Sequence, residues 1–595
     1  MFSAGSELKC TRIIHVLHVL LFGLMLNSVS TGWSQLIISK TVTVDQNIPD
    51  RGQIVSSLTW SDHSGLATIT DVNVGLSLSS ASGSTMRLGQ MYATVTFGTA
   101  SESERVAVLL NREGVSSSSA FGSSLSSLNV VLDDSAPTNI YNLTTSTGTY
   151  QADGRIGVNP YGTRVAYSAN QITAGLSALN GDWLSSSIWS LLVADTQAGN
   201  AAKLNSWSLR VEGLAPSSGT FEVGNNATVS GSGVVNSTLS TGSVGSVTLV
   251  VADGQMLSLN GGLTGVGNLQ TSGGGTTVLS GNSSGFSGTV NVAGTGTAVI
   301  ASTTALGAGS LVQSSGSSTV KFSEAGTWNN AMSVYNVAFT ANGTVLAGRT
   351  TVNHSTFDVG NGNTDTLSGK ITGSGGVKKT GLGTLLLAGS ESNDFQGDSA
   401  VYAGMLKLQK PNALAISGST IALHGGTLLL AAANQIGDAT AVTLNGGLLN
   451  TGGNADRVGI LKVTADSTIA GLVVSSGRGV ATGSDFLFSG VDLTSYSTSS
   501  GSILTLAGVG YGQSVNFASS NYTGWTGYSG DRLNSFADKI QFGSTGMKAQ
   551  LSFEGGTGFT YVTAIPEPNV YVGMAMLLVL VGVAETRRRK SAGKQ

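Results

Sequence analysis

Short runs of alternating apolar and polar residues recur along most of this chain. In its first third they include residues 69–78, 92–97 and 105–110, each flanked by Ser, Gly or Asn clusters. Period-two alternation between such flanks predicts half-buried β-strands. Several strands at short spacing predict an antiparallel sandwich or jelly roll. We therefore expect an all-β protein that begins with a jelly-roll or β-sandwich domain over residues 36–213.

A different pattern runs from about residue 214 to 504. Gly-Thr-Leu-x-Leu pieces recur between glycine corners, most clearly at 374–414 and more weakly from Leu263 onward. One such strand cannot bury its inner face alone, whereas strands stacked in register can, with glycine where a corner needs φ > 0. The pattern predicts a right-handed parallel β-helix solenoid, with about 20–25 residues and ~4.8 Å per coil.

The repeat unit at 374–414 resembles the autotransporter-associated β-strand repeat, and the other copies match it in part. That resemblance implies the elongated passenger architecture of autotransporters. An autotransporter would end in a membrane β-barrel of alternating strands. This sequence instead ends in a basic stretch and Gly593-Lys594-Gln595, so we expect the passenger architecture without the translocator.

Residues 505–562 contain further strand-like segments and a group of aromatic residues. We expect this segment to be a β-rich cap, because the last coil of a solenoid otherwise exposes an unpaired edge. A platform on which sugars stack is the functional alternative for the same aromatic side chains. These are Tyr522, Trp525, Tyr528 and Phe542.

The first domain also carries a family resemblance. It resembles the P domain (P/Homo B domain), the jelly roll that follows the catalytic domain in proprotein convertases and many bacterial subtilisin-like proteases. The family's usual His and Gly-Asp-Leu element is replaced here by residues 91–94. The matching segments are 69–74, 108–114, 132–134, 188–195 and 204–209.

Three acidic residues of this domain are candidates for calcium binding. Asp133, Asp134 and Asp195 lie at expected loop positions, and Ca²⁺ prefers clustered carboxylate and carbonyl oxygens. The alternative is that these side chains cap or open turns. Apart from calcium at these positions, we expect no cofactor.

Both ends of the chain carry export signals. Lys9 and Arg12 precede an apolar core at 13–26 and a small polar segment at 28–35, which together predict a secretory signal peptide over residues 1–35. An uncleaved amino-terminal anchor is the alternative.

The carboxy-terminal segment 563–595 has three parts in a fixed order. Pro566, Glu567 and Pro568 precede an apolar run at 570–584, which we expect to be a short transmembrane helix. A basic stop follows, and four cations hold such an end on the cytoplasmic side. The stop consists of Arg587, Arg588, Arg589 and Lys590.

This tail resembles the PEP-CTERM sorting signal of Gram-negative bacteria. The resemblance implies recognition by an exosortase-type membrane enzyme, export through the inner membrane, a transient hold in that membrane, and a final place at the cell surface or outside the cell. The apolar run has about 15 residues, whereas a permanent span needs roughly 20.

Composition limits the remaining functional classes. The net charge is −3 and only 10% of residues are charged, so a nucleic-acid partner, which needs clustered Lys and Arg, is not expected. The one cysteine, Cys10, lies in the leader. The exported chain therefore has no disulfide and no cysteine-ligated metal.

The chain shows no convergent catalytic set. His424 begins a His-Gly-Gly-Thr segment, but no nucleophile motif matches it, and a subtilisin-like triad needs a catalytic domain of its own. We expect a non-enzymatic surface or matrix protein that displays its jelly roll for adhesion, or associates with exopolysaccharide or other surface proteins. The alternatives are an accessory module in proteolysis and a polysaccharide lyase or hydrolase.

The tail generates the first prediction. Replacing Pro566, Glu567 and Pro568 with alanines should leave the protein in the inner membrane, because the rigid tripeptide would no longer be recognised. Fractionation of inner membrane, outer membrane and medium measures this. The sorting interpretation fails if the variant reaches the surface as the natural chain does.

Overall fold

The computed structural model describes residues 35–59, 66–81, 85–98, 104–156, 172–183, 188–476, 485–496, 501–509, 513–543, 547–554 and 559–566. The expected signal-peptide core, the apolar run at 570–584 and the basic stop lie outside these ranges. No helix within them is long and apolar enough to cross a membrane. The chain divides after Ser310 into two compact units, which are described separately.

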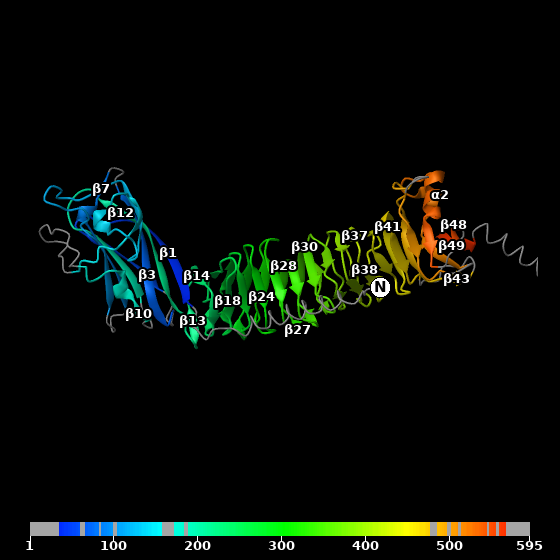
Figure 1. Cartoon of the computed structure of the whole chain (residues 1–595), viewed down its shortest axis with the longest axis horizontal. Coiled ribbons are helices and arrows are strands. Elements are labelled where there is room, and N and C mark those ends of the chain that lie inside the picture. The colour runs from blue at the N-terminus through cyan, green and yellow to red at the C-terminus, as the bar shows by residue number, and fades with distance from the viewer. Residues whose placement is uncertain are drawn as a thin grey trace, which may run out of the picture. The chain divides into compact units, whose positions relative to one another are not determined.

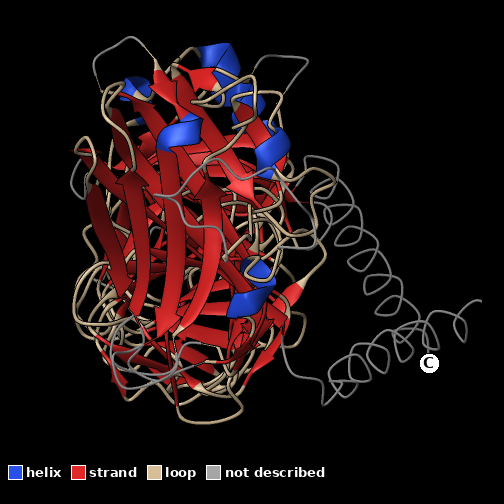
Figure 2. Cartoon of the chain, turned by 90° about the vertical axis from the view of Figure 1, so that its left-hand side faces the viewer, coloured by secondary structure: helices blue, strands red, loops and turns tan. Residues whose placement is uncertain are grey.

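Strands make up most of the described structure (Figures 1 and 2). The first unit begins with antiparallel sheets, as the alternating pattern predicts. One sheet places β12 between β1 and β3, with β8 beyond β3, while β9 runs parallel to β8. Its strands are β1 (Gln35–Asn47), β3 (Thr68–Ser80), β8 (Ser127–Leu132), β9 (Thr147–Tyr150), β10 (Gly181–Asp182) and β12 (Ala202–Leu214).

A second antiparallel sheet has the order β2-β11-β5-β6. The two sheets meet at a buried core, in which Trp207 of the first sheet donates its Nε1–H to Ser56 Oγ of the second at 2.9 Å, and Phe97 stacks on Trp189. The remaining elements of this region are β2 (Gln53–Thr59), β4 (Met86–Arg87), β5 (Met91–Gly98), β6 (Arg105–Asn111), β7 (Ser124–Leu125), β11 (Ile188–Asp195), and the 3-10 turns η1 (Leu88–Gln90), η2 (Ile140–Asn142) and η4 (Leu176–Leu179).

The rest of the first unit is a parallel β-solenoid with three strands in each coil. Residues 18 to 24 positions apart lie side by side; Glu222 pairs with Ser240, and Val247, for example, pairs with Leu269. This agrees with the predicted coil length. The strands are β13 (Thr220–Glu222), β14 (Ala227–Gly231), β15 (Gly233–Val235), β16 (Thr238–Ser240), β17 (Ser246–Val250), β18 (Met256–Leu259), β19 (Leu263–Gly265), β20 (Asn268–Ser272), β21 (Thr276–Leu279), β22 (Gly285–Phe286), β23 (Thr289–Val292) and β24 (Thr297–Ile300).

Strand β1 joins the antiparallel sheet to the solenoid. It pairs with β12 along its length and also with β14, where Leu36 lies opposite Gly231 and Ser39 opposite Thr228. The first solenoid coil would otherwise present the unpaired edge of β14 to solvent. A strand from the start of the described chain therefore covers that edge, which the sequence pattern did not predict.

The second unit continues as parallel coils. One of its sheets has ten strands, in the order β27-β29-β31-β34-β36-β38-β40-β42-β45-β47. Leucines at equivalent inner positions form a buried file through this sheet, so each coil covers the apolar face of the next. The file consists of Leu346, Leu367, Leu387, Leu408 and Leu430.

The strands of the second unit fall into a regular series and a less regular end. The first group is β25 (Ser310–Gln313), β26 (Thr319–Phe322), β27 (Gly326–Trp328), β28 (Met332–Phe339), β29 (Thr344–Leu346), β30 (Thr350–Val359), β31 (Thr364–Leu367), β32 (Ile371–Thr372), β33 (Val377–Thr380), β34 (Thr384–Leu387), β35 (Ser399–Val401), β36 (Met405–Leu408), β37 (Thr420–Leu423), β38 (Thr427–Leu430), β39 (Ala441–Asn445) and β40 (Leu448–Asn450). The second group is β41 (Asp456–Ala465), β42 (Ser467–Ala470), β43 (Ser475–Ser476), β44 (Phe486–Val491), β45 (Leu504–Leu506), β46 (Gln513–Ala518), β47 (Ile540–Phe542), β48 (Met547–Glu554) and β49 (Phe559–Pro566), with the 3-10 turn η5 (Tyr522–Gly524) and helix α2 (Gly530–Asp538).

The last coils of this unit are longer than the others. Ile469 pairs with Leu506, 37 positions later, and Leu506 with Phe542, 36 positions later. The extra residues hold η5 and α2, a helix that the strand pattern did not predict. Ser529 caps α2 by accepting a hydrogen bond from the Arg532 amide at 3.2 Å. Strand pairing also turns antiparallel here, between β46 and β49 and between β49 and β48.

Buried polar side chains support the corners of the coils. Asn393 is almost fully buried; its Oδ1 accepts from the Ile371 amide at 2.9 Å, and its Nδ2 donates to the Ala415 carbonyl at 2.7 Å. These partners lie one coil before and one coil after Asn393. The side chain thus satisfies two backbone groups that a corner would leave unpaired in an apolar interior.

This bridge generates a stability prediction. Asn393→Ala should lower the free energy of unfolding of the second unit by roughly 2–4 kcal/mol, because two buried backbone groups lose their partners. Urea denaturation followed by circular dichroism measures the change. Asn361→Ala, at an exposed turn of the same unit, is the matched control and should shift stability by less than about 0.5 kcal/mol. Equal effects of the two substitutions would contradict the bridging role.

Candidate functional site

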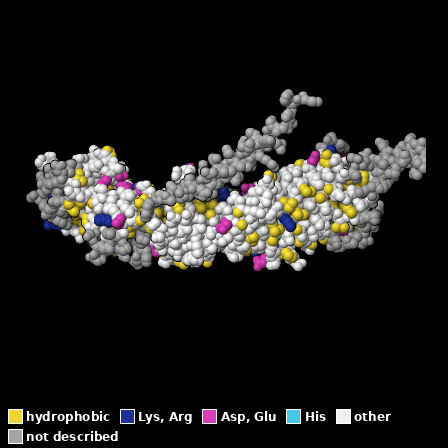
Figure 3. All heavy atoms as spheres, turned by 60° about the horizontal axis from the view of Figure 1, so that its bottom comes forward, with side chains coloured by type: hydrophobic (Ala, Val, Ile, Leu, Met, Phe, Trp, Pro, Cys, Tyr) yellow, Lys and Arg dark blue, Asp and Glu magenta, His cyan; other side chains and the backbone are white. Residues whose placement is uncertain are grey.

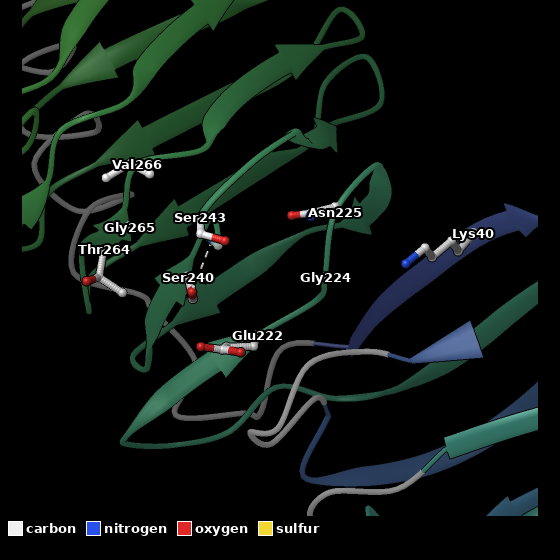
Figure 4. Close-up of a pocket in the computed structure, with 10 residues that line it drawn as sticks. Lys40, Glu222, Gly224, Asn225, Ser240, Ser243, Thr264, Gly265 and Val266 are labelled. Atoms are coloured by element: carbon white, nitrogen blue, oxygen red, sulfur yellow. Dashed lines mark hydrogen bonds between the residues drawn. The ribbon is translucent and has the colours of Figure 1, made fainter. Parts of the chain in front are cut away.

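A surface groove of the first unit lies where β1 meets the first solenoid coils (Figure 4). We call it the junction groove. It has a volume of about 620 Å³. Its lining residues are Lys40, Glu222, Gly224, Asn225, Ser240, Gly242, Ser243, Thr264, Gly265 and Val266.

The register of the coils arranges these side chains in rows. Glu222 pairs with Ser240, and Ser240 pairs with Thr264. A carboxylate and two hydroxyl groups therefore follow one another on successive coils, at the ~4.8 Å strand spacing. The neighbouring corners of the same coils supply Asn225, Ser243 and Val266.

Glycines form the floor between these rows. Gly242 and Gly265 have φ of +72° and +99°, a region that side chains with a Cβ rarely adopt. A Cβ on Gly265 would also lie 2.6 Å from the Gly242 carbonyl oxygen. The corner therefore exposes bare backbone, and a ligand can approach it closely.

Lys40 provides the cation at the sheet end of the groove. It lies on β1, and burial lowers the pKa of its ammonium group below the ordinary value. Glu222 contributes the one carboxylate of the lining. An ammonium group, a carboxylate, an amide and several hydroxyls provide both donors and acceptors, which is the chemistry that hydroxyl-rich ligands require.

The sequence analysis did not identify this groove. Lys40 is more than 180 positions before Glu222, and only the pairing of β1 with β14 brings their strands together. The corner glycines were recognised as turns, but their alignment on successive coils depends on register. The one available signal was the recurrence of glycine at 224, 242 and 265, about one coil apart.

The three candidate calcium ligands lie in separate environments. Asp133 accepts a hydrogen bond from the Ser135 amide at 2.8 Å, and Asp195 accepts one from the Gln197 amide at 3.1 Å. Both are local turns of the kind proposed as the alternative. Burial, together with Asp50, raises the pKa of Asp195 to about 6.

Asp134 has a different role at the start of η4. Its two carboxylate oxygens accept from the amides of Leu176 and Ser177, at 3.1 and 2.7 Å. No group of three or more acidic, histidine or cysteine side chains able to hold a metal occurs in the described ranges. Each of the three aspartates accepts hydrogen bonds from backbone amides at a turn, as in the turn-capping alternative, and calcium binding by them stays a prediction.

The predicted sorting residues fall almost entirely outside the described chain. Pro566 is the last residue of β49 and lies opposite Met547 of β48. Glu567, Pro568, Arg587, Arg588, Arg589 and Lys590 lie beyond it.

His424 lies on the outer surface of the second unit. Its ring stacks on Tyr402 of the preceding coil at 4.8 Å, and its Nδ1 lies 2.9 Å from Asn445 Nδ2 of the following coil. Residues on three successive coils thus form an outward row. His424 therefore lies exposed at a bend of the chain and packs against its neighbours on the surface.

The first unit also contains a buried charged cluster that the sequence did not reveal. Arg155 and Asp153 form an ion pair at 2.5 Å, and both are almost fully buried. Burial and the neighbouring Asp153 raise the pKa of Glu113 well above its ordinary value. The Arg155 guanidinium also lies 4.5 Å from the Tyr141 ring centroid. The cluster connects the segment after β6 to the segment after β9.

Buried ionisable groups also occur inside the solenoid of the second unit. Asp456 Oδ2 accepts from the amides of Gln435 and Ile436, at 2.7 and 3.0 Å. Its Oδ1 is buried without a hydrogen-bond partner in the described structure. Burial raises the pKa of Asp456 to about 7.

Two lysines are also buried inside the second unit. Lys379 and Lys410 are fully buried, and their ammonium groups donate to backbone carbonyls, including Gly381 at 2.8 Å and Glu391 at 2.9 Å. Burial lowers the pKa of Lys379 to about 8 and also lowers that of Lys410. The two ammonium groups therefore satisfy backbone carbonyl groups of their own and adjacent coils.

No family model matches the chain, and no curated protein matches it. A solved structure, the complex of the Aeromonas sobria serine protease with its chaperone, matches with 16% identity and a TM-score of 0.17. That match covers 32% of this chain and 29% of the matched chain. At this TM-score the likeness carries no argument. The resemblances to the P domain, the autotransporter-associated repeat and the PEP-CTERM signal stay predictions.

Asp456 generates a prediction of pH dependence. Between about pH 4 and pH 7 the folded chain binds more protons at this residue than the unfolded chain, so its contribution to stability falls as pH rises. Asp456→Asn keeps the acceptor oxygen and removes the titration. Relative to the natural chain, the variant should gain stability between pH 4.5 and pH 7.5, by at most about 4 kcal/mol.

Urea denaturation at the two pH values measures this gain. Asp253→Asn, at an exposed position of the first unit, is the control and should leave the pH dependence unchanged. The assignment is wrong if Asp456→Asn and the natural chain have parallel stability profiles over this range.

Proposed function

We propose that this chain is a non-enzymatic exported protein of the cell surface or extracellular matrix that associates with polysaccharide. In this proposal the P-domain-like jelly roll is displayed on a right-handed solenoid of autotransporter-associated repeats. The PEP-CTERM-like tail, with a transmembrane helix at 570–584, is handled by an exosortase-type enzyme. The membrane hold is transient, and the chain then acts outside the cell.

The junction groove is the observation that carries the proposal. Glu222, Ser240 and Thr264 occupy paired positions on successive coils, so a linear polymer of hydroxyl-rich units can follow one line of polar side chains, in which Ser240 is the buried member. The backbone beneath this line is held by the parallel pairing of β13, β16 and β19. Such preorganised side chains lose little conformational entropy on binding.

The character of the exposed surface also supports this proposal. On the face shown in Figure 3, charged side chains are scattered and most of the surface is neither charged nor hydrophobic. Binding to such a surface depends on hydrogen bonds and close approach more than on charge.

Affinity electrophoresis of the full chain in mild detergent, through gels that contain single polysaccharides, tests the proposal. Asn225→Ala combined with Ser243→Ala should weaken the retardation by about tenfold in apparent Kd, because two hydrogen-bonding groups are lost. Asn361→Ala combined with Ser317→Ala removes exposed polar side chains elsewhere on the solenoid and should have no effect.

Two results would reject this function. Release of new reducing ends or unsaturated sugars from a bound polymer would indicate a hydrolase or lyase. Equal binding by the groove variant and its control would show that the junction groove does not hold the polymer.

A further inference from the structure

The structure separates the four aromatic residues that the sequence offered for a cap or a sugar platform into two groups. Trp525 and Phe542 are buried, with 4% and 8% of their surface exposed. Tyr528 is 41% exposed and Tyr522 is half-buried. Burial of Trp525 and Phe542 fits the role of a cap. That role does not explain why Tyr528 is exposed and Tyr522 only half-buried.

The loop that carries the two tyrosines is held at several points. The Asn521 side chain accepts from the Thr523 amide at 3.1 Å, and the Tyr528 amide donates to the Trp525 carbonyl at 3.1 Å. The Thr526 carbonyl also accepts from the Leu493 amide at 2.8 Å. Both ends of the loop therefore have fixed backbone positions.

Trp525 anchors the same loop from below. Its Nε1–H donates to Ser520 Oγ at 3.1 Å, and its ring packs edge-on against Phe536 of α2 with centroids 6.2 Å apart. The Arg532 guanidinium donates to the Gly527 carbonyl at 3.0 Å. The exposed rings therefore project from a packed base.

The rings of the half-buried Tyr522 and the exposed Tyr528 lie next to each other. The centroids of Tyr522 and Tyr528 lie 6.4 Å apart, and their planes are inclined by 33°. Tyr528 is exposed, while Tyr522 is half-buried and packs edge-on against Trp525 with centroids 6.4 Å apart. Aromatic groups held in this way are a frequent feature of binding sites, and two neighbouring tilted rings offer stacking surfaces to consecutive units of an amphipathic polymer.

The charges beside the loop favour an uncharged ligand. The backbone of Asp492 forms an isolated β-bridge with that of Thr526. The Asp492 carboxylate forms an ion pair with Lys462 at 3.7 Å. The Arg532 guanidinium is engaged with the Gly527 carbonyl. Asp531 precedes Arg532 in α2, so the formal charges of Lys462, Asp492, Asp531 and Arg532 cancel and give an acidic sugar no net attraction.

We propose that Tyr522 and Tyr528 form a stacking platform for consecutive residues of a neutral pyranose polysaccharide. This inference rests on the proposed association with polysaccharide and names the class of polymer. The apolar C–H faces of the sugars lie on the tyrosine rings, while the phenol groups remain at the wet edge of the contact. Trp525 is a positioning residue, because it holds the loop without facing the polymer.

Affinity electrophoresis of the full chain tests the platform with a panel of neutral polymers: hydroxyethylcellulose, dextran, laminarin and guar galactomannan. Polygalacturonate is the acidic comparison. Tyr522→Ala combined with Tyr528→Ala should weaken binding to the preferred neutral polymer by at least about tenfold. Binding by the natural chain should change little between 50 mM and 500 mM NaCl, since no charge pairing is lost to screening.

Two further variants guard against indirect effects. Tyr522→Phe combined with Tyr528→Phe keeps both rings and should retain binding within about threefold. Tyr402→Ala removes another exposed tyrosine of the second unit, 46% exposed, and should leave binding unchanged. Circular dichroism melting curves of the alanine variant should match the natural chain, because the removed rings are not core.

The outcomes separate the two proposals. If the chain binds a polysaccharide and the double alanine variant binds it equally well, the platform is rejected and the general function stands. Retardation by polygalacturonate alone also rejects the platform and leaves the general function in place. If no polymer of the panel retards the natural chain, both proposals fail.

Discussion

Burial of one coil against the next is the constraint on which the solenoid depends. A single coil with two or three short strands has too little apolar surface to stay folded alone. The leucine file from Leu346 to Leu430 shows how this is solved in the second unit, since every member is covered by the coils on either side. The backbone ladders follow from the same register, because stacking the leucines also aligns the amide and carbonyl groups of neighbouring coils.

Backbone groups would be left without hydrogen-bond partners at the corners of the coils and at the edges of the sheets. Buried polar side chains pair with them at the corners, and extra strands cover the edges. Asn393 and Asp456 pair with corner amides that the ladder leaves unpaired. In the first unit, β1 pairs with β14 and covers the edge of the first coil. In the second unit the last coils become longer and antiparallel. In each case polar side chains or irregular segments interrupt the repeat, and they shield the apolar interior from solvent.

The two proposed contact sites use different consequences of this architecture. The junction groove arises because register aligns polar side chains of successive coils in one line. The tyrosine platform arises where the regular repeat ends and a longer connection becomes possible. A repeating site suits a repeating ligand, and a packed aromatic base suits a ring that must stay exposed. Both proposals therefore name a polymer of hydroxyl-bearing rings as the ligand.

The sequence by itself determined the all-β character, the antiparallel start and the parallel coils of roughly 20 residues, because period-two alternation and glycine spacing are local properties. Tertiary structure decided what local pattern cannot encode. The position of Lys40 in the junction groove requires β1 to pair with β14, a strand about 190 residues later in the chain. Asp133, Asp134 and Asp195 carry metal-ligand chemistry, yet each is engaged by nearby backbone. The four terminal aromatic residues looked equivalent, and only packing buried Trp525 and Phe542 while leaving Tyr522 and Tyr528 toward solvent.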